Sequence, residues 1–182
     1  MLKGTGFPRL INLGIMVENQ FVYLITELLG PSLEDLFNLC GRKFSLKTCL
    51  MLFYQILERL ELMHKKGYIH RDIKPDNMMM GMRDKSPILH MIDFGLTRSV
   101  FNKKAKKHIE FRTGKNLVGT ARFVSINAHL GYELSRRDDL PQKGASDCGT
   151  RGVWPPPASE VLNRADSLGA CPSSDSGLGA LG

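Results

Sequence analysis

The stretch HRDIKPDN, residues 70–77, places a carboxylate, an amine and an amide within six residues of one another. These groups belong to Asp72, Lys74 and Asn77. A second carboxylate, Asp93, opens the tripeptide DFG sixteen residues after Asn77, at the end of an apolar stretch. Phosphoryl transfer needs little covalent help from a protein, but it needs alignment of the reacting groups and neutralisation of their charge. The four side chains are of the types that supply both.

Each side chain has a role in such chemistry. Asp72 would accept the proton of a substrate hydroxyl or orient that hydroxyl, and Lys74 would lie near the transferred phosphoryl group as a compact positive charge. Asn77 and Asp93 offer oxygen ligands of the hard type that Mg²⁺ prefers, alongside the phosphates of a nucleotide. Taken singly, each is an ordinary polar residue of a loop or turn. The two motifs in this order, with a strand, a turn and a strand between them, make the combination specific.

The elements before these motifs follow from apolar patterning. Residues 10–17 and 21–29 are apolar and rich in β-branched side chains, and the short polar stretch between them predicts a hairpin. A Gly-Pro pair then breaks the second strand. Ser32, followed three positions later by Asp35, predicts the start of a short helix that reaches about Leu39.

A longer helix is predicted next, with Ser45 as its N-cap. Two lysines in its last turn interact favourably with the helix dipole, and Gly67 ends the helix. Two short strands, residues 78–80 and 88–92, and a long loop from Asp93 onward complete the expected order. The helix is predicted because apolar residues recur at helical spacing at Leu46, Cys49, Leu50, Phe53, Ile56, Leu57, Leu60 and Met63.

Much of the net charge of +7 lies in residues 98–115. By charge alone such a cluster attracts acidic proteins, phosphorylated peptides, nucleic acid or anionic lipid about equally, and a solvated loop is an equal alternative. The cluster lacks interleaved aromatic residues, so we expect no nucleic-acid partner.

The rest of the composition indicates an intracellular protein. No apolar run approaches the ~20 residues that cross a bilayer, and the N-terminal residues lack the apolar core of a secretory signal. The four cysteines show no zinc-ligand spacing, which favours thiols in a reducing compartment and no structural metal. We therefore expect a cytoplasmic or nuclear protein without a membrane span.

The composition changes at Pro141. Gly, Pro and Ser dominate residues 141–182, and this stretch shows neither helical nor strand periodicity. Such a segment buries too little apolar surface to offset chain entropy, so it is predicted to be a disordered tail, with a short helix at 158–168 as a weaker expectation. The predicted domain division is therefore 1–140 and 141–182.

The HRDxKxxN motif followed by DFG resembles the catalytic core of protein kinases. Further stretches are similar to the casein kinase 1 family of serine/threonine kinases, with its alpha type nearest, and the likeness runs from about Gly6 to Leu140. The resemblance implies an α+β, partial kinase-like fold: the end of the small lobe and the first part of the helical large lobe. The stretches are ELLGPSLEDLF (27–37), KKHIEFR (106–112), GTARFVSINAHLG (119–131), whose SIN replaces the usual Ala-Pro-Glu, and SRRDDL (135–140).

The resemblance also implies roles at the nucleotide site. Glu27 and Leu29 would lie on the hinge and offer backbone groups to adenine, with Thr26 at the gatekeeper position. Met79 and Ile92 would form the apolar floor and back wall under the base. For Thr26 and Met79, ordinary core packing is an equal alternative.

Two further positions are implied for the protein substrate. Thr120 would touch Asp72 and Lys74 and favour a serine or threonine acceptor. Arg122 matches one member of the family's phosphate-binding cluster, which prefers substrates that are acidic or already phosphorylated. The implied cofactors are ATP and Mg²⁺, and the implied partners are such protein substrates.

The sequence lacks several parts that the resemblance leads one to expect. The sequence has no glycine-rich loop, no strand lysine for the phosphates and no helix glutamate to pair with it. Asp139 resembles the aspartate that begins the family's central helix and braces the catalytic loop, but Pro141 follows two residues later. We therefore expect a kinase domain truncated at both ends, with exposed apolar helix faces that could bind chaperones. The alternative function is a catalytically silent kinase fragment, either an interaction module or a product of altered splicing.

Overall fold

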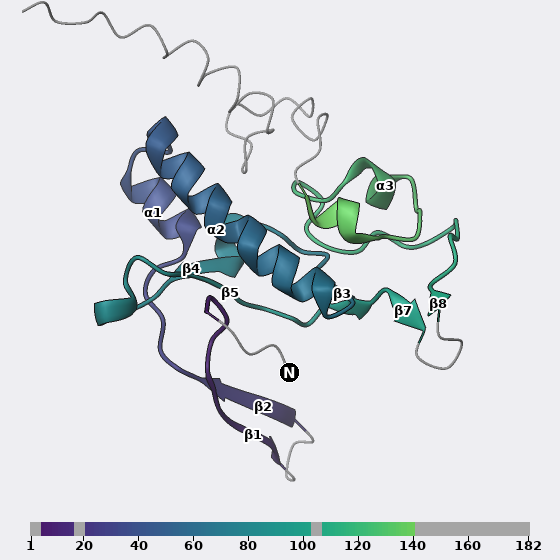
Figure 1. Ribbon diagram of the computed structural model, residues 1–182, viewed down its shortest axis with the longest axis horizontal. Coiled ribbons are helices and arrows are strands. Elements are labelled where there is room, and N and C mark those ends of the chain that lie inside the picture. Colours follow the sequence, from purple (N-terminus) through teal and green to yellow (C-terminus); the bar gives the residue numbers. More distant parts are fainter. Residues whose placement is uncertain (1–4, 17–20, 103–106, 141–182) are drawn as a thin grey trace, which may run out of the picture.

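The computed structural model describes residues 5–16, 21–102 and 107–140, shown in colour in Figure 1. The predicted disordered tail and its weaker 158–168 helix lie outside the described residues. Within them, a mixture of helices and short antiparallel strands confirms the expected α+β class. Among these residues, no helix is long and apolar enough to cross a membrane.

The N-terminal hairpin is confirmed. Strand β1 (Leu10–Met16) pairs antiparallel with β2 (Phe21–Thr26), and a bulge near Leu10 shifts the register. The hairpin projects away from the helices (Figure 1), and its apolar side chains are largely exposed. The prediction that the second strand continues to residue 29 is wrong. The Glu27 N–H donates to the Arg9 carbonyl. Beyond Glu27 the chain leaves β1 and pairs with the segment around Met80.

Helix α1 (Leu33–Leu39) begins at the predicted capping box. The Asp35 N–H donates to Ser32 Oγ at 3.1 Å, and the Ser32 N–H donates to Asp35 Oδ2 at 3.0 Å. These reciprocal bonds satisfy two amides that the first turn would otherwise leave unpaired. Leu33 is buried against the core and anchors the helix there.

Helix α2 (Leu46–Lys65) also starts and ends as predicted. Thr48 N–H donates to the N-cap oxygen of Ser45 at 3.1 Å, and Gly67 leaves the helix with a φ of 80°. One face packs into the core through Leu52, Ile56, Leu60 and Met63, and the opposite face leaves Leu50, Met51 and Tyr54 exposed.

Strands β4 (Met78–Met80) and β5 (Leu89–Met91) form the sheet under α2. Met78 pairs with Met91 in register, and both are fully buried. The strands agree with prediction except that β5 is shorter than residues 88–92. Two 3₁₀ turns flank this pair: η1 (Pro75–Asn77) leads into β4, and η2 (Arg83–Lys85) joins it to β5.

The prediction of a long loop from Asp93 onward is only partly right. Residues of that stretch form short ladders, a helical turn and a 3₁₀ turn, and they build a second apolar cluster around Val100, Val124 and Leu134. Two-residue strands carry too little periodicity to be read from sequence. These elements are β6 (Arg98–Ser99), paired with β3 (Tyr68–Ile69), then β7 (Phe101–Asn102), paired with β8 (Lys107–His108), then α3 (Ile126–His129) and η3 (Arg136–Asp139).

Candidate active site

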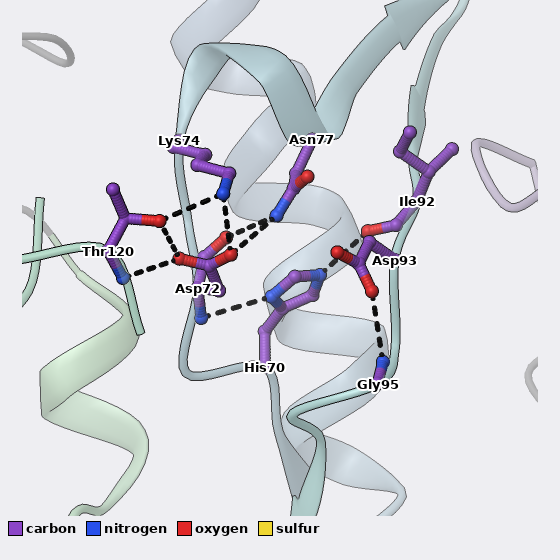
Figure 2. A network of polar contacts seen from close by, with 8 residues as sticks. All are labelled: His70, Asp72, Lys74, Asn77, Ile92, Asp93, Gly95 and Thr120. Carbon is purple, nitrogen blue, oxygen red and sulfur yellow. Dashed lines mark hydrogen bonds and ion pairs between the residues drawn. The ribbon is translucent and has the colours of Figure 1, made fainter. Parts of the chain in front are cut away.

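The loop between β3 and η1 carries the HRD motif and is held from inside by His70. This fully buried ring joins two segments: its Nε2 lies 3.0 Å from the Ile92 carbonyl, and its Nδ1 lies 3.3 Å from the Asp72 amide nitrogen. The partners assign the hydrogen to Nε2, which donates to the carbonyl, while Nδ1 accepts from the amide. Figure 2 shows the ring between the two segments. His70 therefore ties the HRD loop to the residue that precedes Asp93.

Asp139 braces the same loop from η3. Its Oδ2 accepts from the His70 amide at 2.8 Å and contacts His64 Nε2 at 2.8 Å, while its Oδ1 accepts from the Arg71 amide at 2.8 Å. Asp139 as a whole residue is 2% exposed. Arg71 has a φ of 73°, a conformation that costs of order 1–3 kcal/mol for a residue with a side chain. The two amide bonds at His70 and Arg71 hold the chain in this conformation.

The Asp72 carboxylate is the centre of the site (Figure 2). Thr120 donates to Oδ1 twice, from its amide at 2.8 Å and from its hydroxyl at 2.7 Å. On Oδ2, Lys74 Nζ lies at 2.9 Å and Asn77 Nδ2 at 3.1 Å. Lys74 Nζ also donates to Thr120 Oγ1 at 2.8 Å. The structure thus brings together four predicted residues from two segments more than forty positions apart in the sequence.

These contacts determine the charge of Asp72. Burial alone would raise the pKa of its carboxyl group, but hydrogen bonds from Lys74 and Thr120 outweigh burial and hold the pKa below its usual range. Asp72 is therefore ionised at neutral pH. An ionised carboxylate with a lowered pKa is better suited to orienting a hydroxyl than to removing its proton outright.

Asn77 and Asp93 lie on the side of Asp72 that is opposite to Thr120 (Figure 2). Asn77 Nδ2 donates to the Asp72 carbonyl at 2.8 Å, and its amide oxygen points away from Asp72 (Figure 2). Asp93 is exposed and accepts from the Gly95 amide at 3.2 Å. Phe94 packs edge-on against His70, with ring centroids 5.6 Å apart, which holds the DFG segment against the HRD loop.

The donor chemistry of Asn77 and Asp93 fits Mg²⁺ that arrives with a nucleotide. Both offer hard oxygen ligands, and Mg²⁺ sites commonly use one or two protein carboxylates together with substrate phosphates and water. Among the residues that the structure describes, no group of three or more His, Cys, Asp or Glu side chains is arranged as a metal site of its own. The two residues can therefore supply part of a coordination shell, with phosphates supplying the rest.

A cavity of about 1010 Å³ adjoins this network. It is mostly apolar, and its size suits a small-molecule ligand. The cavity and the loop network meet at Ile92, whose amide donates to the Asn77 carbonyl at 3.0 Å. The five residues predicted for nucleotide binding all line it, together with Thr26: Glu27, Leu29, Met79, Ile92 and Asp93.

Backbone groups on the cavity wall remain available for a ligand. Gly30 N–H donates to the Met80 carbonyl at 2.8 Å, which fixes the end of the 27–29 segment. Within the described part of the chain, the Leu29 amide and the Glu27 carbonyl have no backbone partner. An unpaired donor and acceptor beside an apolar cavity are suited to a flat heterocycle with its own polar edge.

Part of the positive charge in the basic stretch 98–115 is paired with an acidic side chain. Arg98 and Lys115 lie 2.7 Å and 3.5 Å from the carboxylate of Glu133, which is nearly buried. Arg122, the predicted phosphate-binding residue, is exposed and lies over the Phe123 ring, with its guanidinium carbon 5.4 Å from the ring centroid. Among the contacts between described residues, none joins Arg122 to the Asp72 network.

Sequence reasoning assigned no role to three residues that shape the site: His70, Glu133 and Asp138. His70 stands inside the HRD motif, which was a usable signal. Asp138 holds the segment 125–127 in place, because its Oδ1 accepts from Ser125 Oγ and from Asn127 Nδ2, each at 2.8 Å. Only the fold reveals that pairing and the one between Glu133 and Arg98.

Comparison with known families adds one finding. A family model described as "Protein kinase domain" matches residues 1–128 of the 182. The matched range contains residues 27–29, the HRD motif, the DFG motif and Thr120.

Proposed function

The chain belongs to the protein kinase family, and from this premise we propose that it is a serine/threonine kinase of the casein kinase 1 type. Its substrates would be proteins with acidic or already phosphorylated sequences. One observation carries the proposal: the Asp72 carboxylate is buried and held in place by Lys74, Asn77 and Thr120. Phosphoryl transfer depends on this kind of preorganised positioning and charge.

Each residue of the network has a defined task in this proposal. Asp72 accepts a hydrogen bond from the substrate hydroxyl and aims its oxygen at the phosphoryl group. Lys74, which Thr120 Oγ1 and Asp72 hold at 2.8 Å and 2.9 Å, places a positive charge beside the transferred group. Thr120 links the catalytic loop to the segment that would receive the substrate, which supports a serine or threonine acceptor.

The cavity is the proposed ATP site. The Glu27 carbonyl and the Leu29 amide would bond the adenine edge, and Met79 and Ile92 would contact its faces. Asn77 and Asp93 would hold Mg²⁺. When bound, Mg-ATP supplies the phosphoryl group and the positive charge that neutralises the phosphates.

The substrate class and the location are proposed on narrower grounds. Arg122 is exposed beside Thr120 in the sequence, which supports recognition of negative charge near the acceptor. The described cysteines, Cys40 and Cys49, are thiols and form no disulfide with each other. A reducing compartment, either cytoplasm or nucleus, suits them.

A transfer assay tests the proposal. The purified chain is incubated with Mg-ATP and casein, and phosphate incorporation is compared between wild type and Asp72→Asn. We expect the substitution to lower the rate by about 10²–10³, the usual cost of losing one preorganised electrostatic contact in an active site. Asp84→Asn, at an exposed position in η2, is the matched control and should leave the rate unchanged. Equal incorporation by wild type and Asp72→Asn would contradict the proposal.

A second measurement separates a kinase from a catalytically silent relative. A ligand that binds the folded state raises its stability, by about 2.7 kcal/mol at a hundredfold excess over Kd. Mg-ATP should therefore raise the melting temperature of the wild-type chain. A chain whose melting temperature Mg-ATP does not change, and which also incorporates no phosphate, would be catalytically silent.

A further inference from the structure

The carboxylate of Glu27 holds three parts of the fold together beside the cavity. Its Oε1 accepts from the Arg9 amide at 2.8 Å, just before β1, and its Oε2 pairs with Lys85 Nζ at 2.7 Å, at the end of η2. The Glu27 amide donates in turn to the Arg9 carbonyl at 3.0 Å. Glu27 is thus bonded through both backbone and side chain to segments far away in sequence.

The η2 turn is built so that Lys85 approaches the 27–29 segment. A Cβ added at Gly81 would lie 2.2 Å from the Lys85 carbonyl oxygen, and one added at Gly30 would lie 2.9 Å from the Gly81 carbonyl oxygen. Only glycine permits both close approaches. The turn is closed further by the Lys85 amide, which donates to the Met82 carbonyl at 3.0 Å. Lys85 therefore starts from a backbone that is fixed next to the hinge segment.

We propose that Lys85 is a positioning residue for the nucleotide site and acts through Glu27. By holding the Glu27 side chain, it keeps the hinge backbone at residues 27–29 in the conformation that presents the Glu27 carbonyl and the Leu29 amide to adenine. This inference rests on the proposed function, because it assumes that the cavity binds a nucleotide. Lys85 itself touches no ligand in this proposal.

The electrostatics agree with a held carboxylate. Hydrogen bonds from Lys85 and then from the Arg9 amide lower the pKa of Glu27, and the nearby His90 contributes in the same direction. Glu27 therefore stays ionised at neutral pH and keeps both bonds. The side chain of Lys85 is 51% exposed and that of Glu27 is 16% exposed, so water screens the pair in part. The expected effect on binding is correspondingly modest.

Calorimetric titration of the full chain with Mg-ATP and with adenosine tests the role of Lys85. We expect Lys85→Met to raise both Kd values by the same factor, about two- to fivefold, since only the adenine end of the site is disturbed. Lys85→Arg keeps the cation and should restore wild-type affinity. Lys47→Met removes an exposed lysine on α2 and is the matched control, for which we expect no change.

A double-mutant cycle separates positioning from general packing. If Lys85 acts through Glu27, the variant with both Glu27→Gln and Lys85→Met should bind no more weakly than Glu27→Gln alone. Additive losses would overturn the inference, and so would a Lys85→Met loss confined to Mg-ATP, which would indicate direct contact with phosphate. Unchanged affinity of Lys85→Met beside normal wild-type binding overturns this inference alone. If the wild-type chain binds neither Mg-ATP nor adenosine, the proposed function is overturned, and this inference is overturned with it.

Discussion

At Asp72, four donors determine both the charge and the orientation of one carboxylate. Two of them come from Thr120, which lies forty-eight positions away in sequence and contacts Oδ1 through its amide and its hydroxyl. The Thr120 hydroxyl also accepts from Lys74 at 2.8 Å, so it joins the cation and the anion of the site. Such a network is worth more when complete, because each buried group that loses its partner keeps its desolvation cost.

Thr120→Val removes this hydroxyl with little change of shape. We expect the variant to lose about 1–3 kcal/mol of unfolding free energy at neutral pH, because Asp72 and Lys74 each lose one partner. Urea unfolding of wild type and variant measures the loss. Thr120→Ser keeps the hydroxyl and is the matched control. Equal stability of the Val and Ser variants would show that the hydroxyl contributes nothing.

The pH dependence of the same difference has a definite sign. The folded-state pKa of Asp72 is depressed below its usual value of 3.8. Its contribution to stability is therefore present above that value and is lost as the pH falls through the lower folded-state pKa. The difference between wild type and Thr120→Val should be complete at neutral pH and shrink below about pH 4. A difference that grows on acidification would contradict this account.

At the scale of elements, η3 fixes the position of the HRD loop. Its last residue, Asp139, accepts from two consecutive loop amides and contacts His64 of α2, so one buried carboxylate joins a helix, a loop and a 3₁₀ turn. The positive φ of Arg71 shows that the loop is held in a conformation it would not adopt alone. The geometry of Asp72 thus depends on an element near the end of the described chain.

Asp139→Asn tests this bracing. The amide side chain keeps one acceptor oxygen but turns an NH₂ group toward a backbone N–H that then has no partner. We expect a loss of about 2–3 kcal/mol in unfolding free energy and faster hydrogen exchange at the His70 and Arg71 amides. Asp84→Asn, at an exposed site, should stay within about 0.5 kcal/mol of wild type. Slow exchange at both loop amides in Asp139→Asn would rule out the bracing role.

At the scale of the whole molecule, the hairpin β1–β2 exposes many large apolar side chains. Ile15 and Val22 face each other across the two strands and are 68% and 69% exposed. Leu13 and Leu24, the next pair, are 57% and 61% exposed. A two-stranded sheet with such a face is marginally stable in water and favours association.

Replacing the outer apolar pair by charges should reduce that association. The variant with Ile15→Lys and Val22→Glu places opposite charges directly across the strands, a pairing that supports the sheet. We expect less binding of an apolar fluorescent dye and a smaller sedimenting species at high protein concentration. The swap of Ile15→Val with Val22→Ile keeps the apolar surface and should behave as wild type. Equal association of the charged variant and the swap would show that this face is not the cause.

Local patterns determined much of this protein. The N-caps at Ser32 and Ser45, the helix end at Gly67 and the strand Met78–Met80 were predictable, because caps and periodicity act over a few residues. Asp72, Lys74 and Asn77, the residues predicted to be catalytic, lie close together because they are neighbours in the sequence. Their roles as ligands and substrate contacts remain predictions.

Tertiary structure decided which distant groups meet these residues. The end of β2 at Thr26 depends on pairing with the Met80 region, and the low pKa of Asp72 depends on Thr120. The contacts of Asp139 with the loop and of Lys85 with Glu27 join positions fifty-eight or more residues apart. No local pattern encodes such pairs, because they form only when the intervening chain packs its apolar face and brings the polar groups within hydrogen-bonding distance.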